Sequence, residues 1–292
     1  MPYPARMIRR VLLSLCAVLL LGLPCQAGGF IQETGTGSID WSSGLVFAEG
    51  TGGKPDTDVS DQTAERLALR EALLQARGKL WQTLQSVRID DETRLAQVVR
   101  ANEDVSERLR GLVHTARILE RQQVPGGRLR VRVGLRLRGS LAKDVIPDTV
   151  WFSGQRQAAA VDTQQQEPGS ELASARNVGY SGLVVDATGL KLEPALLARI
   201  FSQSGSLLYG PSLAEPDAAI ERGLIEYVDS LSQAVKRGRV GKKPLIVRAA
   251  KRRGQSPCDV VIPERKAQLL RAAQKDRQFL RSCRVVIILD GT

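Results

Sequence analysis

GSIDWSSGLVFAEG, at residues 37–50, is the stretch around which the first half of the chain is built. Ile39 and Trp41 alternate with polar neighbours, and residues 45–48 form a short apolar run, so the segment is predicted to be extended. Gly44 interrupts this pattern. An isolated glycine within a strand pattern predicts a bulge or a close approach of another backbone.

The segment that follows, residues 60–88, has the spacing of an amphipathic helix with Ser60 as its N-cap. Its predicted inward stripe consists of Leu69, Leu73, Ala76, Leu80, Leu84 and Val87. A second helix is predicted over residues 91–111, where the acidic residues at the start suit the positive end of the helix dipole.

From residue 116 the hydrophobic period changes from helical spacing to alternation, which predicts strands. One strand leads into a turn at residues 125–127, and the next covers residues 129–137. The outward positions of this second strand are Arg128, Arg130, Arg132, Arg136 and Arg138. Alternate strand residues lie about 7 Å apart. The row is either a solvated face that discourages edge pairing or a contact surface for an anionic partner.

The element order predicts an α+β domain over residues 28–150, a Gln- and Ser-rich linker over 151–178 and a second α+β domain over 179–292. We expect two small α+β domains whose mixed or antiparallel sheets are packed by helices. The elements expected in the second domain are strands at 182–186, 245–249, 260–262 and 284–289, a hairpin at 196–209, and helices at 218–235 and 263–280.

A dense basic run lies between residues 236 and 253 of the second predicted domain. Its candidate binding residues are Lys242, Lys243, Lys251, Arg252 and Arg253. Few aromatic residues interleave with them, so the stacking that nucleic-acid binding uses is not favoured. The run is either a solvated loop or a dock for an anionic component of the cell envelope.

The N-terminus has the features of a secretory signal peptide. Arginines precede an apolar run at residues 11–23, which is too short to span a membrane, and the small residues before position 28 predict cleavage after Ala27. The formal charge of the chain is +11, and removing residues 1–27 with their three arginines leaves +8. A periplasmic protein that meets an acidic partner or surface is predicted, rather than one that binds nucleic acid. Lipidation of Cys25, which would attach the chain to the outer membrane, stays open.

Cys258 and Cys283 are the cysteines that remain after the predicted cleavage. An even number of cysteines in an oxidising compartment permits one disulfide, and two unpaired buried thiols are the alternative. No metal site is predicted, because the cysteines have no histidine nearby and His114 is the sole histidine of the sequence.

No enzyme or cofactor motif is found in the sequence. The glycines around residues 238–243 lack the spacing of a phosphate loop, and a Gly-x-Ser-x-Gly nucleophile elbow is missing. Asp186 and Asp290 lie at the ends of predicted strands, where catalytic carboxylates can lie but turn-forming aspartates are common. We therefore expect a protein without catalytic activity or cofactor.

The segment at residues 37–50, the helix with alanines at 64, 68, 72 and 76, and the hairpin ending at 132–137 together resemble the N-terminal domain of flagellar assembly protein T. They are also similar to small outer-membrane lipoproteins of flagellar basal disks. The resemblance covers about residues 30–147, and residues 180–211 look like a region that accompanies such domains in periplasmic proteins. It implies a periplasmic or outer-membrane-associated role near the flagellar motor, without catalytic residues.

Two functions follow as the leading hypotheses, and the third and least favoured is an enzyme whose polar pocket converges on His114, Asp186 or Asp290. The first is an assembly or scaffold protein that binds envelope or flagellar basal-body proteins, with homo-oligomer formation left open. The second is a basic module that binds lipopolysaccharide or peptidoglycan, both anionic envelope polymers.

Overall fold

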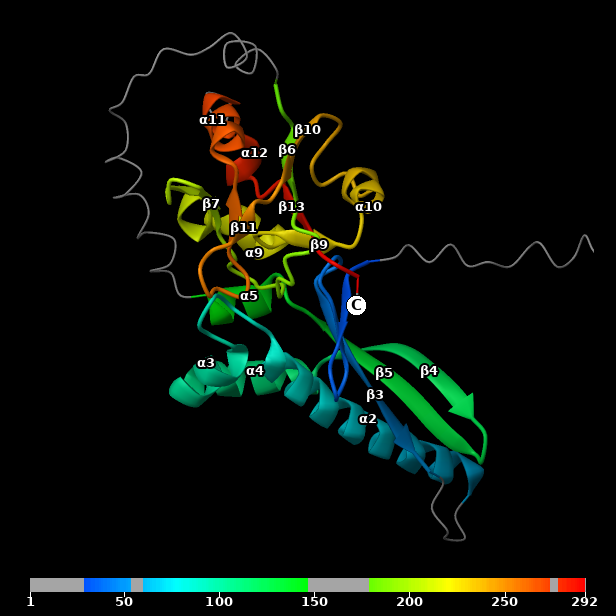
Figure 1. The fold of residues 1–292 in the computed structure, drawn as a ribbon. Helices are drawn as coiled ribbons and strands as arrows, with labels where there is room; N and C mark the ends of the chain where they lie inside the picture. Colours follow the sequence, from blue (N-terminus) through cyan, green and yellow to red (C-terminus); the bar gives the residue numbers. More distant parts are fainter. Residues whose placement is uncertain (1–28, 54–59, 147–178, 274–277, 292) are drawn as a thin grey trace, which may run out of the picture.

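The computed structural model describes residues 29–53, 60–146, 179–273 and 278–291. Within these ranges it contains helices and three β-sheets, which confirms the predicted α+β class (Figure 1). We call residues 29–146 the N-terminal unit and residues 179–291 the C-terminal unit. The predicted signal peptide and the whole of the predicted linker lie outside the described residues.

The N-terminal unit contains one antiparallel sheet with the strand order β1-β2-β3-β5-β4. Its strands are β1 (Ile31–Glu33), β2 (Ser38–Asp40), β3 (Leu45–Gly52), β4 (Arg117–Val124) and β5 (Arg128–Arg136). The hairpin predicted around residues 125–127 is therefore confirmed. Residues 37–50, however, are not one extended segment, and Gly44 does not form a bulge. The chain reverses between β2 and β3, where Leu45 pairs with Asp40 and Gly44 adopts a φ of +69°.

Helix α2 (Asp61–Ser86) runs along β3 and β5 and begins at the predicted N-cap, where the Ser60 side chain accepts a hydrogen bond from the Thr63 N–H (Figure 1). Its buried face confirms the predicted stripe at Ala76, Leu80 and Leu84 and differs from it in the first half of the helix. The buried residues are Ala64, Ala68, Ala72, Ala76, Leu80, Thr83 and Leu84, whereas Leu69 and Leu73 are only partly buried.

The alanine face of α2 is buried because β3 presents glycines to it. A Cβ added at Gly50 would overlap the backbone of Ala72 and Ala76, and one at Gly52 would overlap the carbonyl of Ala68. With small residues on both sides, the helix backbone lies directly on the strand backbone, a close approach that glycine in a strand permits.

The helix predicted over residues 91–111 is two helices, α3 (Leu95–Ala101) and α4 (Glu103–His114). Asn102 separates them in an extended conformation, and its side chain accepts a hydrogen bond from the Val105 N–H as the N-cap of α4. Asparagine competes with the helical backbone in this way, which explains the break. Helix α5 (Ser140–Val145) completes the unit.

The C-terminal unit contains two sheets. One is entirely parallel, with the order β10-β6-β13-β9, and the other is mixed, with the order β11-β12-β7-β8. The parallel strands are β6 (Gly182–Asp186), β9 (Glu226–Val228), β10 (Pro244–Arg248) and β13 (Val285–Ile288). The mixed sheet consists of β7 (Ile200–Ser202), β8 (Leu207–Tyr209), β11 (Lys251–Arg252) and β12 (Val260–Ile262).

The helices of this unit are short. They are η1 (Pro211–Leu213), α9 (Pro216–Arg222), α10 (Leu231–Lys236), α11 (Glu264–Ala272) and α12 (Gln278–Arg281). The helix predicted over residues 218–235 is wrong, because Gly223 ends α9 with φ of +75° and the chain then enters the buried strand β9.

Candidate functional site: an arginine face and a basic pocket

The two units share one hydrophobic core and are joined by buried hydrogen bonds. The Ser42 hydroxyl accepts from the Phe30 N–H and donates to the Tyr227 carbonyl, both at 2.7 Å. The Trp41 ring meets the Tyr227 ring edge-on, with centroids 5.7 Å apart. Trp41 is thus a core residue that anchors the C-terminal unit.

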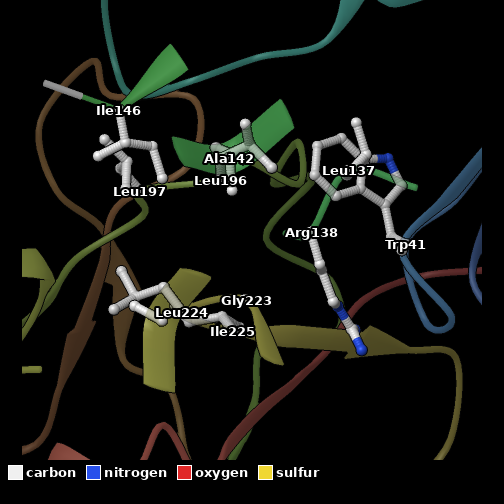
Figure 2. Close-up of a pocket in the computed structure, with 13 residues that line it drawn as sticks. Trp41, Leu137, Arg138, Ala142, Ile146, Leu196, Leu197, Gly223, Leu224 and Ile225 are labelled. Carbon is white, nitrogen blue, oxygen red and sulfur yellow. The ribbon is translucent and has the colours of Figure 1, made fainter. Parts of the chain in front are cut away.

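An apolar cavity lies where the units meet. Leu137, Ala142 and Ile146 line it from one unit, and Leu197 and Leu224 line it from the other (Figure 2). Its volume of about 30 Å³ accommodates a water molecule. Ligand pockets usually have a volume of about 300 Å³ or more, so this cavity is a packing gap and not a binding site.

The arginine row of the prediction divides into two groups. Arg128, Arg130, Arg132 and Arg136 occupy alternate positions of β5, on the side of the sheet opposite the buried Val131 and Val133, and we call these four the outer arginine face. Arg138 follows the end of β5 and belongs to the interface instead. Its side chain runs from the apolar cavity toward β9, and its Nη2 donates to the Ser42 carbonyl at 3.2 Å (Figure 2).

Within the outer arginine face, Arg132 is the most constrained side chain. It forms ion pairs with Glu49 and with Glu120 (3.0 Å), and its guanidinium lies 5.4 Å from the centre of the Phe47 ring. Arg130 is 3.9 Å from Glu49 and is half exposed, and Arg128 donates to the Thr51 hydroxyl. Arg136 is exposed. Glu49 and Glu120 thus neutralise the centre of the face and leave positive charge at both ends.

The candidate binding residues of the basic run at 236–253 do not form one patch. Lys242 and Lys243 precede β10, whereas Lys251 and Arg252 form β11, beyond its other end. The five residues of β10 separate them by roughly 16 Å. Arg253 lies over the Phe201 ring, with its guanidinium 3.5 Å from the ring centre. All five basic side chains are exposed.

Cys258 and Cys283 do not form the predicted bridge, since both are free and buried. Cys258 precedes β12 in the mixed sheet, and Cys283 precedes β13 in the parallel sheet. Their sulfur atoms have separate neighbours, Ser256 and Asp259 for Cys258 and the Arg281 carbonyl for Cys283. The sequence places each cysteine before a strand, but it does not reveal that the two strands belong to different sheets.

Neither thiol of the native chain is expected to react with an alkylating reagent at pH 8. Burial and the Asp259 charge raise the pKa of Cys258 to about 12, and burial raises the pKa of Cys283. At pH 8 only roughly 1 in 10⁴ of the Cys258 thiols would be ionised. In a chain beginning at residue 28, a thiol count without reductant should give none before unfolding and two after it. If no thiol were counted after unfolding either, Cys258 and Cys283 would form a disulfide after all.

The carboxylates at the strand ends serve local structure. Asp186 accepts hydrogen bonds from the Thr188 N–H and hydroxyl and from Arg248. Burial alone would raise the pKa of Asp186, but these bonds lower it. Asp290 accepts from the Gly189 N–H. His114 ends α4 in the other unit, so the three groups do not form a catalytic set.

Among the described residues, no group of three or more His, Cys, Asp or Glu side chains is arranged to hold a metal ion. The described helices also include none with the length and apolarity that a membrane span requires.

Residues 182–291 match the model of a protein family described as Treponema pallidum Tp0624, second domain. The match covers almost the whole C-terminal unit and none of the N-terminal unit. No curated protein matches the chain. The family resemblance of the N-terminal unit, which carries the outer arginine face, therefore rests on the sequence motifs alone.

Proposed function

We propose that this protein is a non-enzymatic assembly or scaffold protein of the cell envelope, and that its outer arginine face binds an acidic surface of a protein partner. The observation that carries the proposal is that the two sides of the N-terminal sheet differ in what they present. One side packs its glycines against the alanines of α2, and the other presents arginines on β5 beside Phe47 and the exposed Leu119.

Composition of the face favours a protein partner. Arginine and aromatic residues are enriched at the centres of protein interfaces, where the guanidinium binds carboxylates through two parallel hydrogen bonds. Phe47 and Leu119 supply apolar area between the charges, and Arg130 and Arg136 extend to the solvent. The strand β4 adds a sheet edge whose residues are exposed over almost its whole length.

The compartment and the finer role rest on sequence. The predicted signal peptide supports a periplasmic location, and the resemblance of residues 30–147 to flagellar assembly protein T suggests a basal-body ring as the assembly. Flagellar proteins with acidic surfaces are therefore the first partners to test.

Reversing the charge of Arg130 and Arg136 together, as Arg130→Glu and Arg136→Glu, is expected to weaken partner binding at least ~10-fold, because electrostatic complementarity sets specificity and association rate. Arg132 is left intact because its ion pairs with Glu49 and Glu120 support the sheet. Binding is measured by surface plasmon resonance against each candidate basal-body protein.

The matched control is Arg66→Glu with Arg70→Glu, on the exposed side of α2. It makes the same change in net charge on the opposite side of the sheet. Unchanged binding in this control, with loss in the first variant, supports the proposal. Equal binding by both double variants and the parent chain would rule the outer arginine face out as the contact surface.

The alternative function, a basic module for lipopolysaccharide or peptidoglycan, is favoured by the exposed lysines and arginines at the two ends of β10. Binding through such dispersed charges would weaken steeply with added salt, because exposed charges are screened within about 10 Å at 0.1 M ionic strength. It would also be lost when Lys242, Lys243, Lys251 and Arg252 are replaced by glutamine, which leaves the outer arginine face unchanged.

A further inference from the structure

A second pocket at the junction of the two units has a volume of about 290 Å³, nearly ten times that of the apolar cavity. It is lined by Arg138, Arg222, Glu226, Gly238, Arg239 and Arg284. Four of these six residues are arginines and one is a glutamate. Arg138 comes from the N-terminal unit and the other residues come from the C-terminal unit, so the pocket exists only when the units are packed together.

Arg239 is the buried member of the set, with 8% of its side chain exposed. Its Nη atoms donate to the carbonyls of Arg222, the last residue of α9, and of Gly223 and Leu224, which follow it. Its Nε is buried and has no hydrogen-bond partner among the described residues. A buried N–H without an acceptor costs free energy.

Glu226 compensates only part of the positive charge. It is buried, and its carboxylate oxygens lie 3.4 Å from Arg237 and 3.9 Å from Arg239. Arg138, Arg222 and Arg284 form no ion pair with a described carboxylate. Burial and the neighbouring Arg239 lower the pKa of Arg138, and burial lowers the pKa of Arg239. Glu226 thus neutralises only part of the positive charge that the arginines bring to the pocket.

We propose that this pocket binds a phosphate group. Guanidinium groups bind phosphate through paired, charge-assisted hydrogen bonds. A phosphate monoester carries a charge close to −2 at pH 7, which matches the surplus of arginines over Glu226 better than a single carboxylate does. The volume of about 290 Å³ accommodates such a group.

The arrangement also indicates how the group would enter. Arg222 and Arg284 are exposed and form the mouth of the pocket, whereas Arg138 and Arg239 lie deeper. A phosphate bound by both Arg138 and Arg239 would connect the N-terminal unit to the C-terminal unit. Binding would therefore stabilise the packing of one unit on the other, independently of any partner on the outer arginine face.

The test is isothermal titration of the full chain with inorganic phosphate and, separately, with glycerol phosphate, at low ionic strength. The variants are Arg222→Gln and Arg284→Gln, which change exposed side chains outside the core. Each is expected to weaken phosphate binding at least about tenfold, the loss of one charged hydrogen-bonding group. Arg252→Gln, an exposed arginine on β11, is the control and should bind as the parent chain does.

The two titrants distinguish the source of the phosphate. If glycerol phosphate binds as tightly as inorganic phosphate, the pocket takes the phosphate end of a larger molecule, and if inorganic phosphate alone binds, it takes the free ion. Either result with loss in both pocket variants supports the proposal. Absence of binding by the parent chain, or binding that both pocket variants retain, would overturn it.

Discussion

Replacing Gly52 with alanine is expected to lower the free energy of unfolding by about 3 kcal/mol or more, at the upper end of the range for overpacked sites. The added methyl group would overlap the carbonyl oxygen and carbon of Ala68 and approach the Ala72 nitrogen. These are backbone atoms of a continuous helix, so no side chain can rotate away and α2 must move off β3. Urea denaturation followed by circular dichroism measures the loss.

Two other glycines provide matched controls for this substitution. A Cβ at Gly53, the residue after Gly52, or at Gly78, within α2, would meet nothing within 4 Å. Gly53→Ala should therefore change stability little, and Gly78→Ala should raise it by about 0.5–1 kcal/mol through helix propensity. If Gly52→Ala were as stable as Gly53→Ala, the close packing of α2 on β3 would be wrong.

Replacing Asp259 with alanine is expected to lower the free energy of unfolding by about 2–3 kcal/mol. Asp259 is fully buried and accepts three hydrogen bonds from Arg199, one from its backbone N–H and two from its guanidinium. Removing one member of a buried ion pair typically costs about 3–5 kcal/mol. The Arg199 side chain is 31% exposed and can still pair with Asp91. We therefore expect the smaller loss of about 2–3 kcal/mol for Asp259→Ala.

Asp91→Ala is the matched control for Asp259→Ala. It removes the other carboxylate bound to Arg199, the one that crosses between the units, but the Asp91 side chain is 30% exposed. Its loss should cost about 1 kcal/mol or less. Thermal or urea unfolding compares the two variants. Equal losses would mean that burial of Asp259 contributes nothing beyond an ordinary surface ion pair.

Local patterns predicted the elements whose signals lie within a few residues of sequence. The N-cap of α2 at Ser60 and the β4–β5 hairpin are confirmed because capping and alternation are local properties. The buried face was predicted wrongly in the first half of α2, since Leu69 and Leu73 carry the stronger apolar signal while Ala68 and Ala72 are buried. That outcome depends on the glycines of β3, which meet the helix only in the folded structure.

The basic pocket could not be predicted from sequence for a related reason. Arg138 continues the alternation of the arginines on β5, and nothing nearby indicates that it leaves their face. The strand ends at Arg136, and Gly139 turns the chain with φ of +75°. Arg239 belongs to a basic run that reads as solvated, yet it is the residue buried beneath the end of α9. The packing of the two units brings them to one pocket.

The most direct test of the proposed function is photocrosslinking in the native host, with a photoreactive amino acid in place of Arg130 on the outer arginine face. The same residue in place of Arg66, on the exposed side of α2, is the comparison. We expect one discrete crosslinked protein from position 130, present in purified basal bodies or another envelope assembly, and none from position 66. Absence of adducts at position 130, or equal adducts at both positions, would contradict a contact role for the outer arginine face.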